Sequence, residues 1–294
     1  MRILVTGANG QVGHELTRTL HGLGEIVATD RSRMNLANPG QIRDVIRELR
    51  PGLIINAAAY TAVDQAETEQ ALAMQLNAHA PAVMAEEARR LGAALIHFST
   101  DYVFDGTRPG RYREQDPTCP VNAYGASKRE GELAIEATGA AALIFRTQWV
   151  YGLHGKNFLL TMLRLAAERD ELRVVEDQIG APTWARTLAE ATAEVVRMGG
   201  GQPASWWTER SGLYHVAAQG ETSWAGFARR IVEMSGLTAK PRVTGIASSD
   251  YPTPARRPAN SRLCCDKFIQ TFCPLPQWDE ALARCMRESL SMDS

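Results

Sequence analysis

The sequence predicts an α/β protein built on a doubly wound parallel sheet, with a smaller cap in the C-terminal part. Short apolar runs alternate with amphipathic stretches through the first half of the chain, which is the pattern of parallel strands covered by helices on both faces. A glycine-rich loop, Gly7–Gly13, separates the first apolar run from the first amphipathic stretch. Beyond about Tyr151 the alternation becomes irregular, and residues 238–262 are rich in proline and arginine.

In the first half, each apolar run is followed by a stretch with helical periodicity. Asn38 and Pro39 form a helix start signal, because asparagine caps helices and proline is favoured at the first helical position. We expect strands at 2–6, 25–30, 53–59, 93–100 and 141–147, and helices at 11–20, 39–49, 70–91 and 123–137.

In the second half the elements are fewer and less regularly spaced. Thr222 or Ser223 is a candidate cap for a helix that runs to Ser235, with Gly236 as its stop. We expect further helices at 157–169, 184–198 and 277–290, and strands at 172–177 and 212–218.

Composition excludes several classes of function. The 294 residues include 32 basic and 33 acidic side chains, for a net charge of -1, so we expect no general attraction to nucleic acid or membranes. The N-terminus enters a strand without a signal-peptide pattern, and no apolar run approaches the roughly 18 residues of a membrane span. The five cysteines include no C-x-x-C pair, which favours reduced thiols and a cytoplasmic protein.

The glycine loop is a candidate dinucleotide site. Gly7, Gly10 and Gly13 have the spacing G-x-x-G-x-x-G, which differs from the commoner G-x-G-x-x-G. Their expected roles are the same: a tight turn, close approach of the backbone to a pyrophosphate, and close helix–sheet packing. The pyrophosphate is expected to face the backbone N–H groups around Gln11 and Val12 at the helix start.

Residues after the second strand bear on the choice between NADH and NADPH. Asp30 ends that strand, where a carboxylate accepts hydrogen bonds from the adenosine ribose and favours NADH. Arg31 and Arg33 follow, and a nearby arginine pairs with the 2′-phosphate of NADPH. The sequence leaves both cofactors open, and a turn cap is the alternative interpretation of Asp30.

These observations suggest two domains. We expect residues 1–150 to form a dinucleotide-binding, Rossmann-like domain that also receives a strand and a helix from about 172–198. Residues 151–171 and 212–294 are expected to form a smaller substrate-binding domain over the carboxyl edge of the sheet, where α/β proteins bind ligands.

A tyrosine–lysine pair supplies candidate carbonyl chemistry. Tyr124 and Lys128 are four residues apart, so they share one face of a helix. A lysine ammonium one turn away is expected to lower the pKa of the phenol from its ordinary value near 10. Thr100, at a strand end, offers a hydroxyl to polarise a carbonyl. Ser99 is its rival, but strand alternation points the two residues to opposite faces. We interpret His97 as a core residue of the same strand.

Together these motifs resemble the extended short-chain dehydrogenases/reductases. Further segments resemble the dTDP-4-dehydrorhamnose reductase family over nearly the whole chain. That resemblance implies reduction of the C4 ketone of dTDP-4-dehydro-β-L-rhamnose by NADPH or NADH, the final step of dTDP-L-rhamnose synthesis for cell-surface polysaccharides such as the lipopolysaccharide O-antigen. The segments are VDQAE (63–67), STDYVF (99–104), FRTQWVY (145–151), DQIGAPT (177–183) and YPTPARRP (251–258).

The resemblance also implies roles for individual residues. Asn35-Leu36 stands where the family has an acidic–hydrophobic pair, which again leaves the cofactor open. The implied catalytic residues are Thr100, Tyr124 and Lys128. Tyr124 and Lys128 are also expected to contact the cofactor, Lys128 through the nicotinamide ribose hydroxyls. The implied cofactor contacts are Gly10, Gln11, Val12, Asp30, Asn35, Leu36, Ala59, Tyr60 and Thr61, and the implied sugar contacts are Thr100, Asp101 and Trp149.

Two features concern charged partners. Arg256-Arg257, on a proline-rich loop, provides two forked donors for the diphosphate of a nucleotide sugar. Some family members carry a magnesium ion at a subunit contact, for which Glu15 is a candidate ligand. Arg186 and Thr187 occupy the place where further ligands are expected, so we predict no metal and a monomer or weak homodimer.

Two other functions fit the same scaffold. One is a nucleotide-sugar epimerase or dehydratase. Elimination needs an acid–base pair after the strand-end threonine, and here Asp101 is followed by Tyr102. The other is a non-catalytic subunit resembling the beta subunit of methionine adenosyltransferase, against which the intact Thr100, Tyr124 and Lys128 argue.

Overall fold

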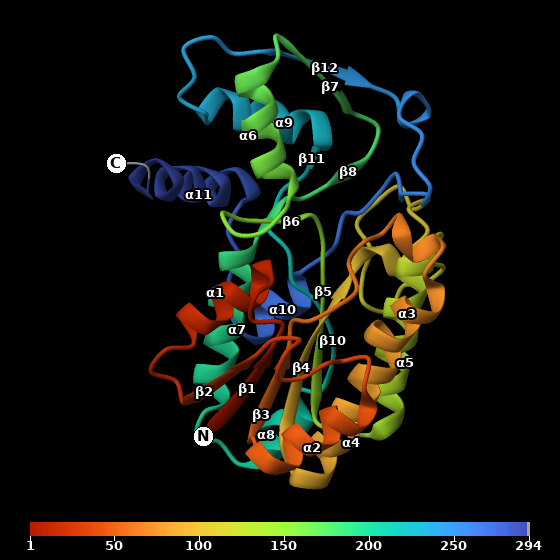
Figure 1. The fold of residues 1–294 in the computed structure, drawn as a ribbon, viewed down its shortest axis with the longest axis vertical. Coiled ribbons are helices and arrows are strands. Elements are labelled where there is room, and N and C mark those ends of the chain that lie inside the picture. The colour runs from red at the N-terminus through yellow and green to blue at the C-terminus, as the bar shows by residue number, and fades with distance from the viewer. Residues whose placement is uncertain (293–294) are drawn as a thin grey trace.

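The centre of the molecule is a six-stranded parallel sheet, seen in the computed structural model of residues 1–292 (Figure 1). Its strand order, β10-β5-β4-β3-β1-β2, is doubly wound, which confirms the predicted Rossmann-like fold. The strands are β1 (Arg2–Thr6), β2 (Glu25–Thr29), β3 (Leu53–Asn56), β4 (Ala94–Thr100), β5 (Ala142–Thr147) and β10 (Gly212–His215).

Helices cover both faces of this sheet (Figure 1). Alternation along the strands supplies two separate cores: Leu4, Ile54 and Leu95 face one side, whereas Ile3 and Ile55 face the other. The first core is closed by α2 (Pro39–Leu49), α4 (Ala80–Leu91) and α5 (Ala123–Thr138), and the second by α1 (Gln11–Thr19), α7 (Ala185–Gly199) and α10 (Asp266–Thr271).

The helix expected at 70–91 is divided into three pieces. It comprises α3 (Gln70–Met74), a π-helical turn at Gln75–His79 and α4, and all three pieces contact α5. Asparagine caps fix the starts of two other helices. The Asn38 side chain accepts from the N–H of Gln41 at α2, and the Asn122 side chain accepts from the N–H of Gly125 at α5.

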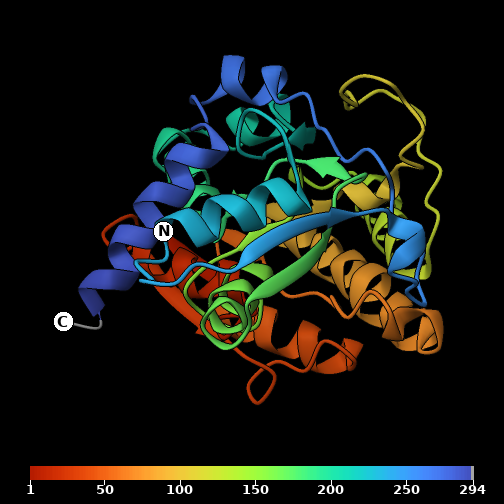
Figure 2. The same cartoon turned by 90° about the horizontal axis from the view of Figure 1, so that it is seen from above.

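A smaller part lies beyond the carboxyl ends of the sheet strands (Figure 1), and the view from above shows α9 and β12 across them (Figure 2). It has its own core, which includes Tyr151, Leu172, Phe227 and Leu282. Its elements are α6 (Phe158–Glu168), β7 (Glu171–Val175), α9 (Trp224–Met234), β12 (Arg242–Ile246) and α11 (Trp278–Met292).

Short elements complete the chain. β6 (Val150–Tyr151) pairs with β9 (Thr183–Trp184), and β8 (Ile179–Gly180) pairs with β11 (Thr222–Ser223). Three 3-10 turns lie at Gln65–Glu67, Asp101–Val103 and Ser248–Asp250, and α8 spans Ala204–Glu209. Within the described residues, no helix combines the length and apolarity that crossing a membrane requires.

Two strand assignments were wrong. The strand predicted near 172–177 does not join the large sheet, because β7 pairs with β12. β7 alternates exposed and buried residues, whereas every residue of β4 in the large sheet is buried. The strand predicted at 212–218 for the smaller domain is instead β10, the neighbour of β5. The helix predicted at 184–198 packs as α7 against α1, and the two domain boundaries stay a prediction.

Candidate active site

The glycine loop joins β1 to α1 in a geometry that requires glycine. Gly7 has a φ of +69°, and the N–H of Gly10 donates to its carbonyl at 2.9 Å. A Cβ on Gly13 would lie 2.0 Å from the Gly7 oxygen, so no other residue fits there without moving the loop. Gly10 is the N-cap of α1 and has no side chain to occupy the first-turn N–H groups, so these remain suited to an anion.

A cavity of about 300 Å³ lies beside this loop. Its position at the carboxyl ends of β1, β2 and β3 is where doubly wound sheets bind nucleotides. It brings together Gly7, Asp30, Asn35, Leu36, Ala59 and Tyr60 of the expected cofactor site, with Thr6, Arg31, Met34, Ala37, Ala58, Leu72 and Leu76 as further lining residues. Gly10, Gln11, Val12, Gly13 and Thr61 lie outside this lining; the first four belong to the loop and helix start, and Thr61 is exposed.

Asp30 combines both of its expected roles. Its carboxylate accepts from the hydroxyl and N–H of Ser32 at 2.6 and 2.9 Å, and from the N–H of Arg33 at 3.3 Å. These hydrogen bonds, those from Ser32 above all, lower the pKa of Asp30. The residue therefore closes a turn and also places a charged carboxylate in the cavity wall, next to Arg31.

Thr100 and Tyr124 meet at the end of β4. The Tyr124 hydroxyl hydrogen-bonds to Thr100. The Thr100 hydroxyl donates to the Asp101 carboxylate at 3.1 Å and accepts from the N–H of Tyr102 at 3.2 Å. Ser99 faces away, and its hydroxyl donates to Glu132 at 2.6 Å. This arrangement favours Thr100 over Ser99 as the polarising hydroxyl.

The direction expected for the pKa of Tyr124 was wrong. Burial raises the pKa of Tyr124 to about 12. Lys128 is one turn away, but its Nζ donates to the carbonyl of Phe98 at 2.6 Å and lies 3.2 Å from Nε2 of His97. Burial also lowers the pKa of Lys128 to about 8. At neutral pH the phenol is therefore protonated and able to donate a proton.

Asp101 is a buried carboxyl beside this pair. It is 3% exposed, and its Oδ2 has no hydrogen-bond partner among the described residues. Burial raises the pKa of Asp101 to about 7. A carboxyl that is only partly ionised at neutral pH thus lies behind the Thr100 hydroxyl.

A second cavity, of about 540 Å³, lies between the smaller part and the loops that follow β3 and β4. Arg169, Arg173 and Arg257 give it positive charge, while Phe158 and Trp224 contribute apolar walls. The sequence did not indicate Arg169, Arg173 or Trp224, because their approach to the site depends on the packing of the smaller part. The remaining lining residues are Asp64, Tyr102, Thr161, Met162, Leu165, Val174, Val175, Gln178, Tyr251 and Thr253.

The two adjacent arginines have different environments. Arg257 pairs with both carboxylate oxygens of Asp64, at 2.5 and 2.8 Å, and lines the second cavity. Arg256 is exposed and lies outside the described lining, and its carbonyl accepts from the Asn122 side chain at 2.8 Å. Only Arg257 of the pair is therefore positioned at this cavity.

Trp149 lies close to this cavity without lining it. Its φ is +47°, and its ring stacks on Trp224 with centroids 3.8 Å apart. A Cβ on Gly180 would lie 2.7 Å from the Trp149 ring, so the indole is confined on that side as well. One face of the Trp149 indole is therefore covered by Trp224.

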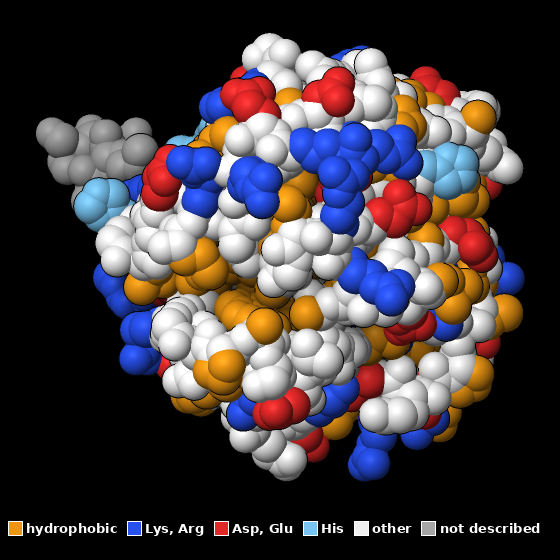
Figure 3. Space-filling view, turned by 90° about the horizontal axis from the view of Figure 1, so that it is seen from below, with side chains coloured by type: hydrophobic (Ala, Val, Ile, Leu, Met, Phe, Trp, Pro, Cys, Tyr) orange, Lys and Arg blue, Asp and Glu red, His pale blue; other side chains and the backbone are white. Residues whose placement is uncertain are grey.

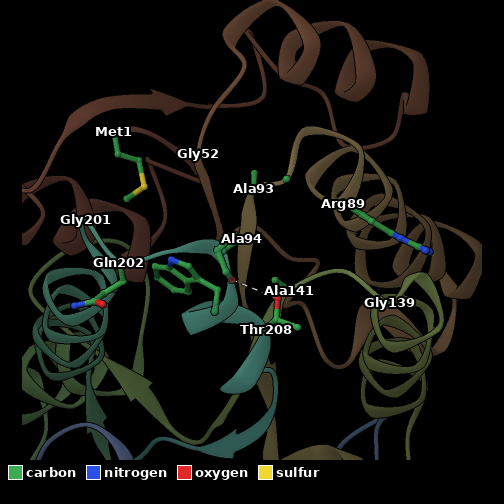
Figure 4. A pocket seen from close by; sticks show the side chains of 14 residues that line it. Met1, Gly52, Arg89, Ala93, Ala94, Gly139, Ala141, Gly201, Gln202 and Thr208 are labelled. Carbon is green, nitrogen blue, oxygen red and sulfur yellow. Dashed lines mark hydrogen bonds between the residues drawn. The ribbon is translucent and has the colours of Figure 1, made fainter.

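A third cavity, of about 340 Å³, lies at the opposite end of the sheet. The surface at that end is hollowed, with hydrophobic side chains inside the hollow (Figure 3). Met1, Gly52, Ala93, Ala94 and Ala141 belong to the cavity lining (Figure 4). These are residues at the amino ends of the strands, and ligands of doubly wound sheets bind at the carboxyl ends, so this cavity is separate from the site.

The candidate metal position is occupied by an arginine. The Arg186 guanidinium pairs with Glu15 and, at 3.4 Å, with Glu288. Across residues 1–292, no three His, Cys, Asp or Glu side chains are grouped so as to hold a metal ion. Glu15 therefore has a cationic partner within its own chain.

Comparison with known proteins places this geometry in a family. The family model described as the RmlD substrate binding domain matches residues 1–291. The chain is 48% identical to the dTDP-4-dehydrorhamnose reductase of Burkholderia thailandensis, covering 99% of this chain and 100% of that protein.

The chain belongs to the dTDP-4-dehydrorhamnose reductase family.

Other members of the family are similar to this chain over nearly its whole length. The Escherichia coli K12 dTDP-4-dehydrorhamnose reductase is 43% identical over 98% of each chain. The structure of the Bacillus anthracis reductase in complex with NADP has a TM-score of 0.90 at 37% identity and covers 98% of this chain and 99% of that one. A Thermus thermophilus UDP-glucose 4-epimerase, 20% identical with a TM-score of 0.80, shares the fold.

Proposed function

We propose that the protein reduces the C4 ketone of dTDP-4-dehydro-β-L-rhamnose to give dTDP-L-rhamnose, using NADPH or NADH. The observation that carries this is the contact between Thr100 and the protonated Tyr124 at the carboxyl edge of the sheet, in a chain 48% identical to a reductase of that name. The product is a nucleotide sugar for cell-surface polysaccharide synthesis.

The residues at the glycine loop fit a dinucleotide. The first-turn N–H groups of α1, around Gln11 and Val12, suit the pyrophosphate, because Gly10 leaves them without a capping side chain. Asn35 and Leu36 line the cavity in which the adenosine part fits. When bound, the reduced nicotinamide supplies the hydride that is added to C4 of the sugar.

Tyr124 supplies the proton for the ketone oxygen. Its raised pKa keeps it protonated at neutral pH, which is the state that a general acid needs. Thr100 provides a second hydroxyl at the same place. After transfer, Tyr124 is a phenolate and Lys128 is the nearest cationic side chain on its helix face, so Lys128 stabilises the anion until solvent returns a proton.

The second cavity suits the nucleotide sugar. A diphosphate carries negative charge, and Arg169, Arg173 and Arg257 provide donors that match it. Trp224 and Phe158 offer apolar walls for the less polar parts of the ligand. Asp101, Trp149 and Arg256 stay predicted contacts, with Arg256 the least well placed.

One assay tests this function against the two rival functions. Purified protein is mixed with NADPH and enzymatically prepared dTDP-4-keto-6-deoxy-L-sugar, and both NADPH oxidation and the sugar product are followed. We expect stoichiometric oxidation and dTDP-L-rhamnose. Isomerised or dehydrated sugar without NADPH consumption would favour an epimerase or dehydratase, and NADPH binding without turnover would favour a regulatory subunit.

Location and assembly belong to the same proposal. All five cysteines are unpaired thiols, which supports a reducing, cytoplasmic setting. The internal ion pair between Arg186 and Glu15 supports a monomer or weak homodimer without a bridging metal. Analytical ultracentrifugation with and without magnesium tests this, and a tight dimer that depends on magnesium would contradict it.

A further inference from the structure

Asn122, the residue before α5, makes two different hydrogen bonds with one side chain. Its Oδ1 accepts from the N–H of Gly125 at 2.8 Å, and its Nδ2 donates to the carbonyl of Arg256 at 2.8 Å. The first bond caps α5 two residues before Tyr124, and the second reaches a loop 134 residues further along the chain. The side chain is 7% exposed, so both bonds are largely shielded from water.

The two partners together specify asparagine at this position. A backbone N–H only donates and a backbone carbonyl only accepts, so the side chain must offer an acceptor to Gly125 and a donor to Arg256. Aspartate and serine also cap helices, but a carboxylate has no donor, and a serine hydroxyl lies one atom closer to the backbone than an amide nitrogen. Capping alone therefore does not explain the bond to Arg256.

The loop that Asn122 reaches is the one that places Arg257 at the second cavity. Asp64 fixes the other side of this loop. It accepts from the N–H of Ala255 at 3.1 Å and from both terminal guanidinium nitrogens of Arg257. The loop is thus held between the segment after β3 and the start of α5.

Tyr102 brings the arginine and the helix together at a second point. Its side chain hydrogen-bonds to Arg257, and its ring meets the Tyr124 ring edge to face, with centroids 5.8 Å apart. A Cβ on Gly125 would lie 2.1 Å from the Tyr102 carbonyl oxygen, so α5 packs directly on this backbone. Arg257 and Tyr124 therefore belong to one packed unit.

We propose that Asn122 is a positioning residue that sets the placement of Arg257 relative to the proton donor Tyr124; this inference rests on the proposed function. In a bound nucleotide sugar, the position of the diphosphate constrains where the ketone lies relative to the Tyr124 hydroxyl. A misplacement of about 1 Å can cost about 10²-fold in rate. Because Asp64 holds Arg257 independently, the bond from Asn122 acts on kcat more than on binding.

Two variants separate this role from capping. Asn122→Asp keeps the shape and Asn122→Ser keeps a neutral side chain. Both keep an acceptor for the cap, and neither places a donor at the Arg256 carbonyl. Glu67 also holds the start of α5, because its Oε1 accepts from the N–H of Ala123 at 2.8 Å, so Tm should change little. We expect kcat to fall by about 10-fold or more, with the dissociation constants of dTDP and NADPH within about threefold of wild type.

Asn38 provides the matched control. It caps α2 by accepting from the N–H of Gln41 at 3.1 Å, and it is exposed. Across residues 1–292, this cap is the only hydrogen bond that its side chain makes. Asn38→Asp and Asn38→Ser should therefore leave kcat unchanged. Equal losses of kcat in the Asn38 and Asn122 variants would overturn the proposal.

Hydrogen–deuterium exchange of the proteins without ligands tests the link independently of the proposed function. We expect both Asn122 variants to exchange faster than wild type in residues 251–258, with exchange in α5 unchanged. A wild type that does not reduce the keto sugar, in a set of proteins that shows this pattern, would contradict the proposed function and still support the link.

Two results would overturn the proposal. One is a kcat near that of wild type in both Asn122 variants, or a kcat that falls only in step with Tm. The other does not depend on the variants being folded. In wild-type protein labelled with ¹⁵N-asparagine, we expect the side-chain N–H of Asn122 that faces Arg256 to exchange slowly with solvent, and rapid exchange would show that the bond is absent.

Discussion

Arg257 and Asp64 form a two-point ion pair, with Nη1–Oδ1 and Nη2–Oδ2 distances of 2.5 and 2.8 Å. It joins the C-terminal segment to the loop after β3, which lie far apart in the sequence. Because both side chains are partly exposed, the pair contributes little to folding stability. Its effect is to fix the plane of the guanidinium at the rim of the second cavity.

The neighbouring arginines provide a matched test of substrate binding. Arg257→Ala should raise KM for the sugar nucleotide by about 10- to 100-fold, the effect of removing one charged hydrogen-bonding group. Arg256→Ala should change it little, because Arg256 is exposed and outside the described lining. Steady-state kinetics of the two variants measure this difference in KM. An equal rise in KM for both variants would show that the arginine loop binds the sugar nucleotide as a whole.

The glycine loop should respond differently at two of its positions. A Cβ on Gly13 would lie 2.0 Å from the Gly7 oxygen, whereas one on Gly10 would lie 3.2 Å from it. Gly13→Ala should therefore lower Tm markedly and abolish cofactor binding. Gly10→Ala should leave Tm almost unchanged and weaken NADPH by about 10-fold, through its approach to the pyrophosphate. Thermal unfolding measures Tm, and fluorescence titration measures NADPH affinity. Equal Tm values for the two variants would contradict the conclusion that a side chain at position 13 does not fit the loop.

Arg31 should distinguish the two cofactors. It lines the nucleotide cavity beside Asp30, where a guanidinium is able to pair with a 2′-phosphate. Arg31→Ala should weaken NADPH by about 10-fold or more and leave NADH unchanged. Dissociation constants for the two cofactors provide the measurement. An equal rise in the dissociation constants of NADPH and NADH would show that Arg31 contacts the adenine or supports the loop and does not recognise the 2′-phosphate.

Asp101 should make stability depend on pH in an unusual direction for a carboxyl. Its pKa is raised from 3.8 to about 7 in the folded protein, so folding takes up a proton between these pH values. The stabilisation is complete below about pH 4 and is lost as pH rises through about 7. Asp101→Asn removes this loss, and its free energy of unfolding relative to wild type should rise by a few kcal/mol between pH 4 and 8.

Urea unfolding of both proteins at several pH values measures this difference. Asp250→Asn is the control, because Asp250 is exposed, and its difference from wild type should stay flat. A flat difference for Asp101→Asn as well would show that the Asp101 carboxylate is well solvated in the folded protein.

The features predicted from the sequence are those encoded in short segments. The glycine loop, the strand-end Thr100 and the Tyr124–Lys128 spacing each lie within one strand–helix unit, so local periodicity was enough to bring them to one sheet edge. β7 was misplaced because its partner, β12, lies in a segment with weak periodicity.

Other features depend on contacts between distant segments. His97 was interpreted as a core residue of its strand, and its polar contacts became visible only when β3 placed Asn56 beside it. The pKa of Tyr124 was misjudged for a similar reason: the spacing predicts that Lys128 is near, but it does not predict that distant segments bury the phenol and that this burial raises its pKa.

The most direct test is the turnover of Tyr124→Phe with NADPH and dTDP-4-dehydro-β-L-rhamnose, measured together with NADPH affinity. The phenol supplies the proton, so kcat should fall by about 10²- to 10⁴-fold. NADPH affinity should stay near that of wild type, because Tyr124 lies outside the described lining of the nucleotide cavity. Unchanged kcat would contradict the assignment of Tyr124 as the general acid and, with it, the account of this site.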